Sequence, residues 1–266
     1  MGQLEVSAAG GASSTGGSAV IYFLMPAYNE ETEIESRLRN IGTLMAQKGL
    51  PFEIWVVNDG SRDRTVEIID EVSKGIPVRV IHHQVNLGIG AAFLSGLKEL
   101  VKIVRDEDIV ITLDADNTHN LKTVEFMLKK IDEGYEVVIG SCFTTGGMMV
   151  GVPLIRYLLS YLSNFAYRLL FHVKGIRTYT GFYRAHSGAA IKTAFLKFGD
   201  RLIETAGFAA MAEMLVKFRQ IPLFLTEVPM IIRYDLKGRA SKMRILATIR
   251  EHLGVIAQNL LKRRMI

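Results

Sequence analysis

Short apolar runs alternate along this chain with longer segments in which apolar residues recur every three or four positions. Four of the apolar runs have the length of buried strands: residues 20–25, 54–57, 78–82 and 109–113. Three of the longer segments have the period of amphipathic helices: residues 31–48, 63–74 and 90–104. This order predicts a parallel sheet with right-handed crossovers. The expected fold class is therefore α/β, with an open, mostly parallel sheet flanked by helices.

The two ends of the chain differ from this alternating part. Residues 1–18 are rich in Gly, Ser and Ala and lack a hydrophobic period, so we interpret them as a disordered leader. Residues 246–266 carry an apolar stripe that ends in three consecutive basic residues. This pattern predicts an amphipathic helix that packs on the domain or lies on an anionic membrane surface. A single folded domain is expected over residues 19–245.

The composition of the 266 residues, 49% hydrophobic and 22% charged, fits one globular domain. The net charge of +5 fits nucleotides, lipid phosphates or an acidic membrane, whereas the basic residues lack the interleaved aromatics of a nucleic-acid platform. Cys142 is the single cysteine, and no secretory signal opens the chain, which favours a reducing cytosolic environment. No stretch meets the transmembrane criterion, so any membrane association is expected to be peripheral.

Two acidic signatures each follow a predicted strand. One is Asn58-Asp59-Gly60-Ser61 and the other is Asp114-Ala115-Asp116. Ligands of open α/β sheets collect at the carboxyl ends of the strands, where both signatures are expected. Two carboxylates one residue apart suit Mg²⁺ or Mn²⁺ together with the oxygens of a diphosphate, and we rank Asp116 first and Asp114 second as ligands. The pattern favours a sugar-nucleotide transferase over a solvated pair that caps the next helix.

The loop after the first strand offers further nucleotide contacts. Pro26 stiffens the strand exit, Tyr28 offers a ring for stacking on a base, and Glu30 is an acceptor for a base or ribose hydroxyl. The alternative is a helix start at which the acidic residues only favour the helix dipole.

Asp59 is expected to face the same cleft, because Gly60 permits a sharp turn after the strand, although an N-cap role stays open. A Gly-rich turn at residues 86–90 lets the backbone pass close to a nucleotide at Gly88, with simple helix entry as the alternative. It lacks the full G-x-G-x-x-G of a dinucleotide-binding fold.

These motifs recur in an order that resembles the family 2, GT-A fold glycosyltransferases. The later segments Thr180-Gly181-Phe182-Tyr183-Arg184-Ala185, Glu227-Val228-Pro229 and Lys237-Gly238-x-x-Ser241-Lys242 resemble the dolichyl- and polyprenyl-phosphate mannose synthase branch. The resemblance covers roughly residues 19–245, with a nucleotide-binding half at about 19–118 and an acceptor half at about 119–245. It implies an inverting hexosyltransferase that uses Mg²⁺ or Mn²⁺, GDP-mannose as the favoured donor and a polyprenyl or dolichyl phosphate as acceptor.

The resemblance also implies roles for individual residues. The residues expected at the nucleotide are Pro26, Tyr28, Glu30, Asp59, Gly88, Asp114 and Ala115, with Asp59 at the base or ribose. Asp114 and Asp116 are the expected metal ligands, and Thr118 takes the place of the Gln or Ser that relatives use as a third one. His119 is a further candidate there, although a lone His in a loop is more often a hydrogen-bonding group. Asp116, Arg233 and Lys242 are the expected catalytic residues.

The segment 152–173 has one narrow polar line on an otherwise apolar helix: Arg156, Ser160, Asn164 and Arg168. In a water-soluble domain this line would face solvent. At a membrane surface it would lead a phosphate headgroup to the cleft while the apolar sides meet acyl chains. The resemblance favours the second view and assigns Arg156 and Ser160 to the acceptor phosphate, but Cys142 stands where relatives have an arginine.

No side chain is evident as a general base, because Arg177 or Thr178 stands where relatives have an aspartate. A phosphate acceptor is already anionic and needs no such base, so we favour phosphate attack. Cations cluster around Gly238, in a predicted mobile loop after a strand at 228–232, and Arg233 and Lys242 among them match the family pattern.

Two other functions stay open. One is a UDP-sugar-dependent transferase of the same fold with a different lipid or glycan acceptor. The other is a catalytically silent sugar-nucleotide-binding subunit, which the departures at Cys142 and Thr178 favour. A membrane surface and a membrane-anchoring subunit are candidate partners.

Overall fold

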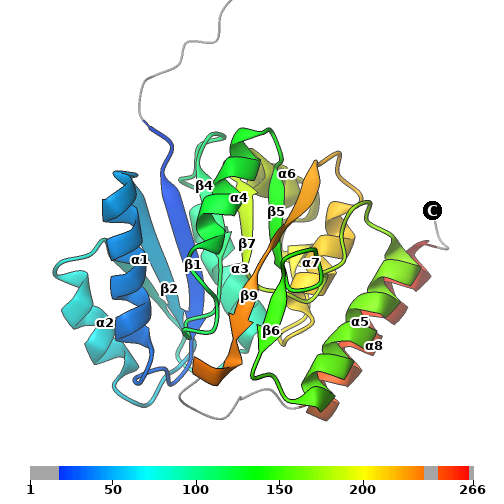
Figure 1. Cartoon of the computed structure of the whole chain (residues 1–266), viewed down its shortest axis with the longest axis horizontal. Coiled ribbons are helices and arrows are strands. Elements are labelled where there is room, and N and C mark those ends of the chain that lie inside the picture. The colour runs from blue at the N-terminus through cyan, green and yellow to red at the C-terminus, as the bar shows by residue number, and fades with distance from the viewer. Residues whose placement is uncertain (1–17, 237–244, 264–266) are drawn as a thin grey trace, which may run out of the picture.

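The computed structural model describes residues 18–236 and 245–263, with side chains to residue 261. Nearly all of the expected leader and most of the basic loop that contains Lys242 therefore lie outside the described residues. The fold is a seven-stranded sheet in the order β3-β2-β1-β4-β7-β5-β8, and the expected mostly parallel α/β class is confirmed (Figure 1). Its strands are β1 (Ile21–Ala27), β2 (Phe52–Asn58), β3 (Val78–His82), β4 (Ile109–Thr112), β5 (Val137–Ser141), β7 (Arg184–Ser187) and β8 (Leu225–Pro229).

Only β7 runs against its neighbours, since it pairs antiparallel with β4 and β5. A small second sheet joins β6 (Met148–Val150) to β9 (Ile231–Arg233) in parallel. The helices are α1 (Ile34–Lys48), α2 (Thr65–Ser73), α3 (Ile89–Leu100), α4 (Thr123–Asp132), α5 (Leu154–Phe171), α6 (Gly188–Phe198), α7 (Ala210–Phe218) and α8 (Ile245–Arg263). Two short 3₁₀ helices lie at Gly199–Leu202 and Tyr234–Leu236.

Alternate residues of the central strands enter two separate cores, one on each face of the sheet. In β1, Phe23 packs on the face covered by α1, α2 and α4, whereas Leu24 packs on the face of α3, α6 and α7. The predicted apolar face of α1 is buried, which explains why its segment folds as a helix against the sheet.

The predicted single strand at 228–232 is wrong, because the chain changes sheets there. Pro229 ends β8, and the Met230 N–H then donates to Ser141 O while its carbonyl accepts from Met148 N, both at 3.0 Å. Pro229 has no N–H to continue the ladder, and β9 begins at Ile231 beside β6.

The helices α5 and α8 run alongside each other at one end of the molecule, away from α1 and α2 (Figure 1). They are joined by the Tyr167 hydroxyl and His252 Nδ1, 3.0 Å apart. The predicted C-terminal amphipathic helix is therefore present as α8. Among the described helices, none combines the length and the apolar character needed to cross a bilayer.

Candidate active site

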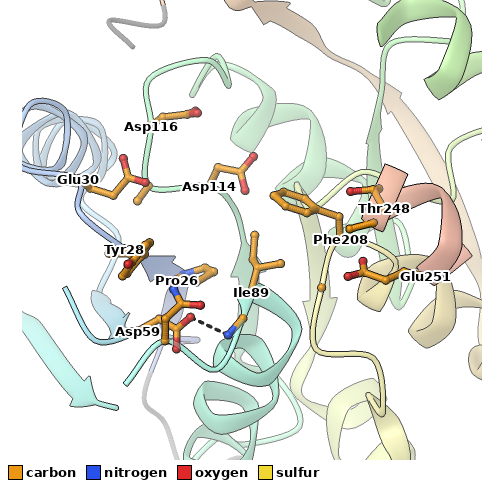
Figure 2. A pocket seen from close by; sticks show the side chains of 16 residues that line it. Pro26, Tyr28, Glu30, Asp59, Ile89, Asp114, Asp116, Phe208, Thr248 and Glu251 are labelled. Carbon is orange, nitrogen blue, oxygen red and sulfur yellow. Dashed lines mark hydrogen bonds between the residues drawn. The ribbon is translucent and has the colours of Figure 1, made fainter. Parts of the chain in front are cut away.

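A cavity of about 330 Å³ lies at the carboxyl ends of β1, β2 and β4. All seven residues that the sequence assigns to the nucleotide line it: Pro26, Tyr28, Glu30, Asp59, Gly88, Asp114 and Ala115. Asp116 lines it as well. The opposite wall comes from Gly207, Phe208 and residues of α8, so the cavity is not confined to the predicted nucleotide-binding half (Figure 2).

Asp59 organises the Gly-rich turn. The residue is 2% exposed, and its Oδ1 accepts from Leu87 N at 2.9 Å and lies 2.7 Å from His83 Nδ1, while its Oδ2 accepts from Gly88 N at 2.9 Å. At Gly88, which has φ +98°, a Cβ would lie 2.5 Å from Ala206 O. Glycine is thus required for both the turn and its close approach to the facing loop. The sequence analysis missed His83, although its place directly after the predicted strand 78–82 was a usable signal.

The loop after β1 is fixed to the loop after β2 by backbone-to-side-chain hydrogen bonds. Asn29 N donates to Ser61 Oγ at 3.0 Å, and Glu30 N donates to Thr65 Oγ1 at 2.7 Å. Tyr28 and Glu30 therefore come from a braced loop on the side of the cavity opposite Phe208 (Figure 2). This arrangement suits a flat ligand that enters between the two loops and the sheet edge.

The two carboxylates of the acidic pair differ in their surroundings. Asp116 Oδ1 accepts from both the backbone N and the hydroxyl of Thr118, at 3.1 and 2.5 Å, whereas the Asp114 side chain is more open and its Oδ2 lies 3.7 Å from His119 Nε2. Thr118 is buried and does not line the cavity. Its predicted role as a third metal ligand stays a prediction, with its hydroxyl hydrogen directed at Asp116.

Helix α1 holds the turn that carries the acidic pair. The guanidinium of Arg37, 1% exposed, donates to the carbonyls of Asp116 and His119, the latter at 3.2 Å, and Glu33 Oε2 accepts from Asn117 N at 2.9 Å. Burial lowers the pKa of Arg37, and the nearby Tyr183 and acidic groups oppose that shift. The sequence analysis missed Arg37, although a cation beside Leu38 on the apolar face of a helix was a usable signal.

The loop that carries Gly207 and Phe208 is fixed from below by α7. The buried Glu213 accepts from Glu204 N and Thr205 N through Oε2, at 3.0 and 2.8 Å, and pairs with Lys217 through Oε1 at 2.5 Å. The sequence analysis assigned no role to this segment. Its function as a cavity wall depends on contacts between parts of the chain more than a hundred residues apart.

A second cavity of about 140 Å³ lies between α5 and α8 and shares Phe208 and Thr248 with the first. Arg156 and Ser160 line it, so the structure brings the two predicted acceptor residues together. His252 lines it too, and burial lowers the pKa of this histidine to about 4. The Cys142 thiol, by contrast, is held neutral, because burial raises its pKa to about 12.

The polar line of α5 does not face solvent as a group. Asn164 is buried and accepts from Tyr179 N at 2.6 Å and Thr180 N at 3.1 Å, and Arg168 alone of the line is exposed. The apolar side chains of α5 point outward instead: Leu154, Ile155, Tyr157, Leu158, Tyr161, Leu162, Phe165 and Leu169 are exposed. The solvent-facing alternative for this polar line is therefore wrong.

Neither cavity is lined by Arg233, Arg177 or Thr178. Arg233 pairs with Asp235 at 2.7 Å, and its N–H donates to Thr118 O at 2.9 Å, beside the acidic pair's turn. The backbone N–H groups of Arg177 and Thr178 donate to Glu227 Oε1 at 2.7 and 2.5 Å. Lys242 is outside the described residues.

The model of glycosyl transferase family 2 matches residues 22–195, which span the whole sheet edge described above. The chain belongs to this family. The expected GT-A fold is borne out as well, because solved structures of glycosyltransferases superpose on most of this family 2 domain. Mannosyl-3-phosphoglycerate synthase from Rubrobacter xylanophilus matches with a TM-score of 0.66 and 16% identity, covering 93% of this chain and 76% of that one. Glucosyl-3-phosphoglycerate synthase from Mycobacterium tuberculosis matches with a TM-score of 0.63 and 20% identity, covering 91% and 80%.

Curated relatives of this family 2 chain include two enzymes named for lipid-linked mannose. The "Dolichol-phosphate mannosyltransferase" of Pyrococcus furiosus is 34% identical over 52% of this chain and 37% of its own length. The "Polyprenol monophosphomannose synthase" of Mycolicibacterium smegmatis is 32% identical over 61% of this chain and 60% of its own length. The matched region thus spans less than two thirds of either relative.

Proposed function

We propose that this chain is an inverting hexosyltransferase that moves mannose from GDP-mannose onto a polyprenyl or dolichyl phosphate at the cytosolic face of a membrane. The observation that carries the proposal is the pair of adjoining cavities. One contains the acidic pair, the other contains Arg156 and Ser160, and both share Phe208 and Thr248. The names of the two mannosyltransferase relatives support the same substrates.

The larger cavity is the proposed donor site. Tyr28, Glu30 and Asp59 line the side proposed for the base and ribose, and Asp114 to Asp116 line the part proposed for the diphosphate. The carboxylate of Asp59 already accepts from two backbone N–H groups, so its main proposed contribution is to shape the turn at Gly88. The backbone of that turn is then available to approach the nucleotide.

The donor chemistry of the acidic pair fits Mg²⁺ or Mn²⁺. Within the described residues no group of three His, Cys, Asp or Glu side chains converges, so Asp114 and Asp116 would hold the ion together with diphosphate and water oxygens. An ion bound there would neutralise the charge of the departing nucleoside diphosphate. Solved structures of glucosyl-3-phosphoglycerate synthase with Mn²⁺ and UDP-glucose support a divalent ion in this fold.

The smaller cavity is the proposed site of the acceptor phosphate. An oxygen of the phosphate, positioned by Arg156 and Ser160, attacks the anomeric carbon as the bond from that carbon to the diphosphate breaks. A single in-line displacement of this kind inverts the configuration. The acceptor oxygen is already ionised near neutral pH, which agrees with the absence of an evident base at Thr178. Arg233 and Lys242 are proposed to neutralise the leaving diphosphate.

The exposed apolar side chains of α5, joined by Leu246, Ile249, Leu253 and Leu261 of α8, are the proposed membrane-facing surface. Large exposed apolar patches on soluble proteins mark contact sites for membranes or protein partners. A lipid acceptor carried in the bilayer would reach Arg156 and Ser160 from this side, and a membrane-anchoring subunit is the proposed alternative cover.

One incubation tests the donor and the acceptor together. Purified protein is mixed with Mn²⁺, radiolabelled GDP-mannose and a short polyprenyl phosphate, with UDP-glucose and UDP-GlcNAc in parallel. Label in the organic phase from GDP-mannose alone supports the proposal. Organic-phase label from a UDP-sugar replaces the donor assignment, and donor binding without transfer or hydrolysis favours a silent binding subunit.

A further inference from the structure

The C-terminal helix contributes an acidic side chain to the donor cavity. Ala247, Thr248 and Glu251 of α8 line the cavity from the side of Phe208, opposite Tyr28 and Asp59 (Figure 2). The apolar pattern of this segment predicted a helix that packs on the domain or lies on a membrane, and that pattern gave no reason to expect a carboxylate inside the cavity. Glu251 is therefore a residue of the cavity that the motifs do not account for.

The carboxylate of Glu251 rests on Gly207. A Cβ on Gly207 would overlap both Oε1 and Oε2 of Glu251, so only glycine leaves room for this carboxylate. Both oxygens thus lie against the same backbone position in the cavity wall. Gly207 belongs to the loop that Glu213 fixes through Glu204 N and Thr205 N, which makes the position of the carboxylate a consequence of a braced loop.

One oxygen of this carboxylate lacks a donor. Glu251 Oε2 is buried and has no hydrogen-bond partner within the part of the chain that the structure describes. A carboxylate is an acceptor of several hydrogen bonds, and a buried oxygen left unpaired is unfavourable. The Glu251 side chain lines the cavity, so a small rotation of it would bring this oxygen to a ligand hydroxyl and remove that penalty.

The position and the charge of Glu251 select the part of the ligand that it can bind. A phosphate is disfavoured beside Glu251, because a second anion beside a carboxylate is repelled unless a cation lies between the two. The base and ribose are proposed to lie on the opposite side, against Tyr28 and Asp59. We infer that Glu251 binds a hydroxyl group of the hexose that the donor carries, and so helps to select the sugar. This inference rests on the proposed function of the cavity.

Equilibrium binding separates this role from a general effect on the cavity. The affinities of GDP and GDP-mannose are measured by calorimetry with Mn²⁺ for the wild type, Glu251→Ala, Glu251→Gln and the control Gln258→Ala, which changes an exposed residue of the same helix. In Glu251→Ala we expect GDP-mannose to bind about tenfold more weakly, as for a lost hydrogen bond to a charged group. GDP should bind equally well or slightly better, because a negative charge near an anionic ligand is removed. The affinity of Glu251→Gln for GDP-mannose should lie between those of the wild type and Glu251→Ala. Gln258→Ala should bind both ligands as the wild type does.

Donor analogues that lack one hexose hydroxyl sharpen the test. The wild type should bind at least one deoxy analogue about tenfold more weakly than GDP-mannose, and Glu251→Ala should not distinguish the two. Gly207→Ala, which fills the space of the carboxylate, should reproduce the sugar-specific loss. The inference is overturned if GDP and GDP-mannose weaken equally in Glu251→Ala, or if neither changes.

Failure of the proposed function has a different signature. If the wild type binds a UDP-sugar in place of GDP-mannose, the donor assignment fails, and the same comparison with UDP and that sugar decides the role of Glu251. If the wild type binds no nucleotide sugar, both proposals are rejected. In a third case, the wild type binds GDP-mannose without transferring the sugar, while Glu251→Ala still shows the sugar-specific loss of affinity. That result supports the role of Glu251 and rejects only the catalytic proposal.

Discussion

The larger cavity, the proposed donor site, and the smaller cavity, the proposed acceptor site, share a wall but differ in how their other walls are held. Around the larger cavity, the buried side chains of Asp59, Arg37 and Glu213 each hold a loop through hydrogen bonds to its backbone. Around the smaller cavity, α5 and α8 meet through Tyr167 and His252, and their apolar side chains are exposed on the outer side. The first cavity is held by hydrogen bonds between distant protein groups, whereas the second borders an exposed apolar surface.

The largest expected effect comes from the acidic pair. Asp116→Asn keeps the size of the side chain and its hydrogen bond from Thr118 N but removes the charge that would hold the metal ion and diphosphate. We expect turnover to fall by about 10³-fold or more, since leaving-group stabilisation is the main proposed catalytic contribution. Rates at saturating Mn²⁺ and the circular dichroism spectrum are the measurements. A wild-type rate at high metal concentration would remove Asp116 from the mechanism.

A substitution of Arg37 tests whether activity depends on the support that α1 gives to the turn, and not only on the carboxylates of Asp114 and Asp116. Arg37→Lys keeps a positive charge, but one ammonium cannot reproduce the two-carbonyl contact of the guanidinium with Asp116 and His119. We expect a loss of about 2 kcal/mol in the free energy of unfolding, by urea titration, and a rate about 100-fold lower. Arg39→Lys, at an exposed position of the same helix, is the control. A stable variant with a normal rate would show that the turn needs no support from α1.

A substitution of Arg156 tests whether the two cavities bind different substrates, because it should change the KM of one substrate more than that of the other. Arg156→Ala removes a cation from the smaller cavity, so the KM of the polyprenyl phosphate should rise about tenfold while that of GDP-mannose changes less. Initial rates over both substrates give the two constants. The opposite order of effects would assign Arg156 to the donor.

The ease of prediction also differs between the two regions. The residues proposed for the donor lie at or just after strand ends, and a strand end in a parallel sheet has a known position, so Pro26, Asp59 and Asp114 were found at one cavity as expected. The sequence analysis missed Glu251 and Phe208, because no local pattern indicates that a C-terminal helix and a loop before α7 lie at the carboxyl end of β1. Only tertiary packing decides that approach, and Gly207, which makes it possible, looks like any loop glycine in the sequence.

The direction of α5 shows the same limit in another form. Its period of four correctly predicted a helix with a polar line, but the period cannot tell which side faces the protein. The structure buries Asn164 against the 178–180 turn, and the apolar side is therefore the outer one. Periodicity alone therefore predicts the two sides of α5, and one tertiary contact, such as that of Asn164, is needed to tell which side faces solvent.

The smallest expected effect concerns that outer surface. Leu162 of α5 is 57% exposed, and Leu196 of α6 is 90% exposed outside the α5 and α8 surface, so the two are a matched pair for adding a charge. Leu162→Asp should weaken binding to vesicles that contain anionic lipid by about fivefold. Burial of the leucine in the membrane favours binding, whereas burial of an aspartate opposes it. Leu196→Asp should leave vesicle binding unchanged, as measured by sedimentation. Both variants should turn over a short, water-soluble polyprenyl phosphate at the wild-type rate, since neither residue lines a cavity. Equal losses in the two variants would mean that net charge, and not the α5 surface, governs the association, and the acceptor cavity would then have no proposed apolar partner on its outer side.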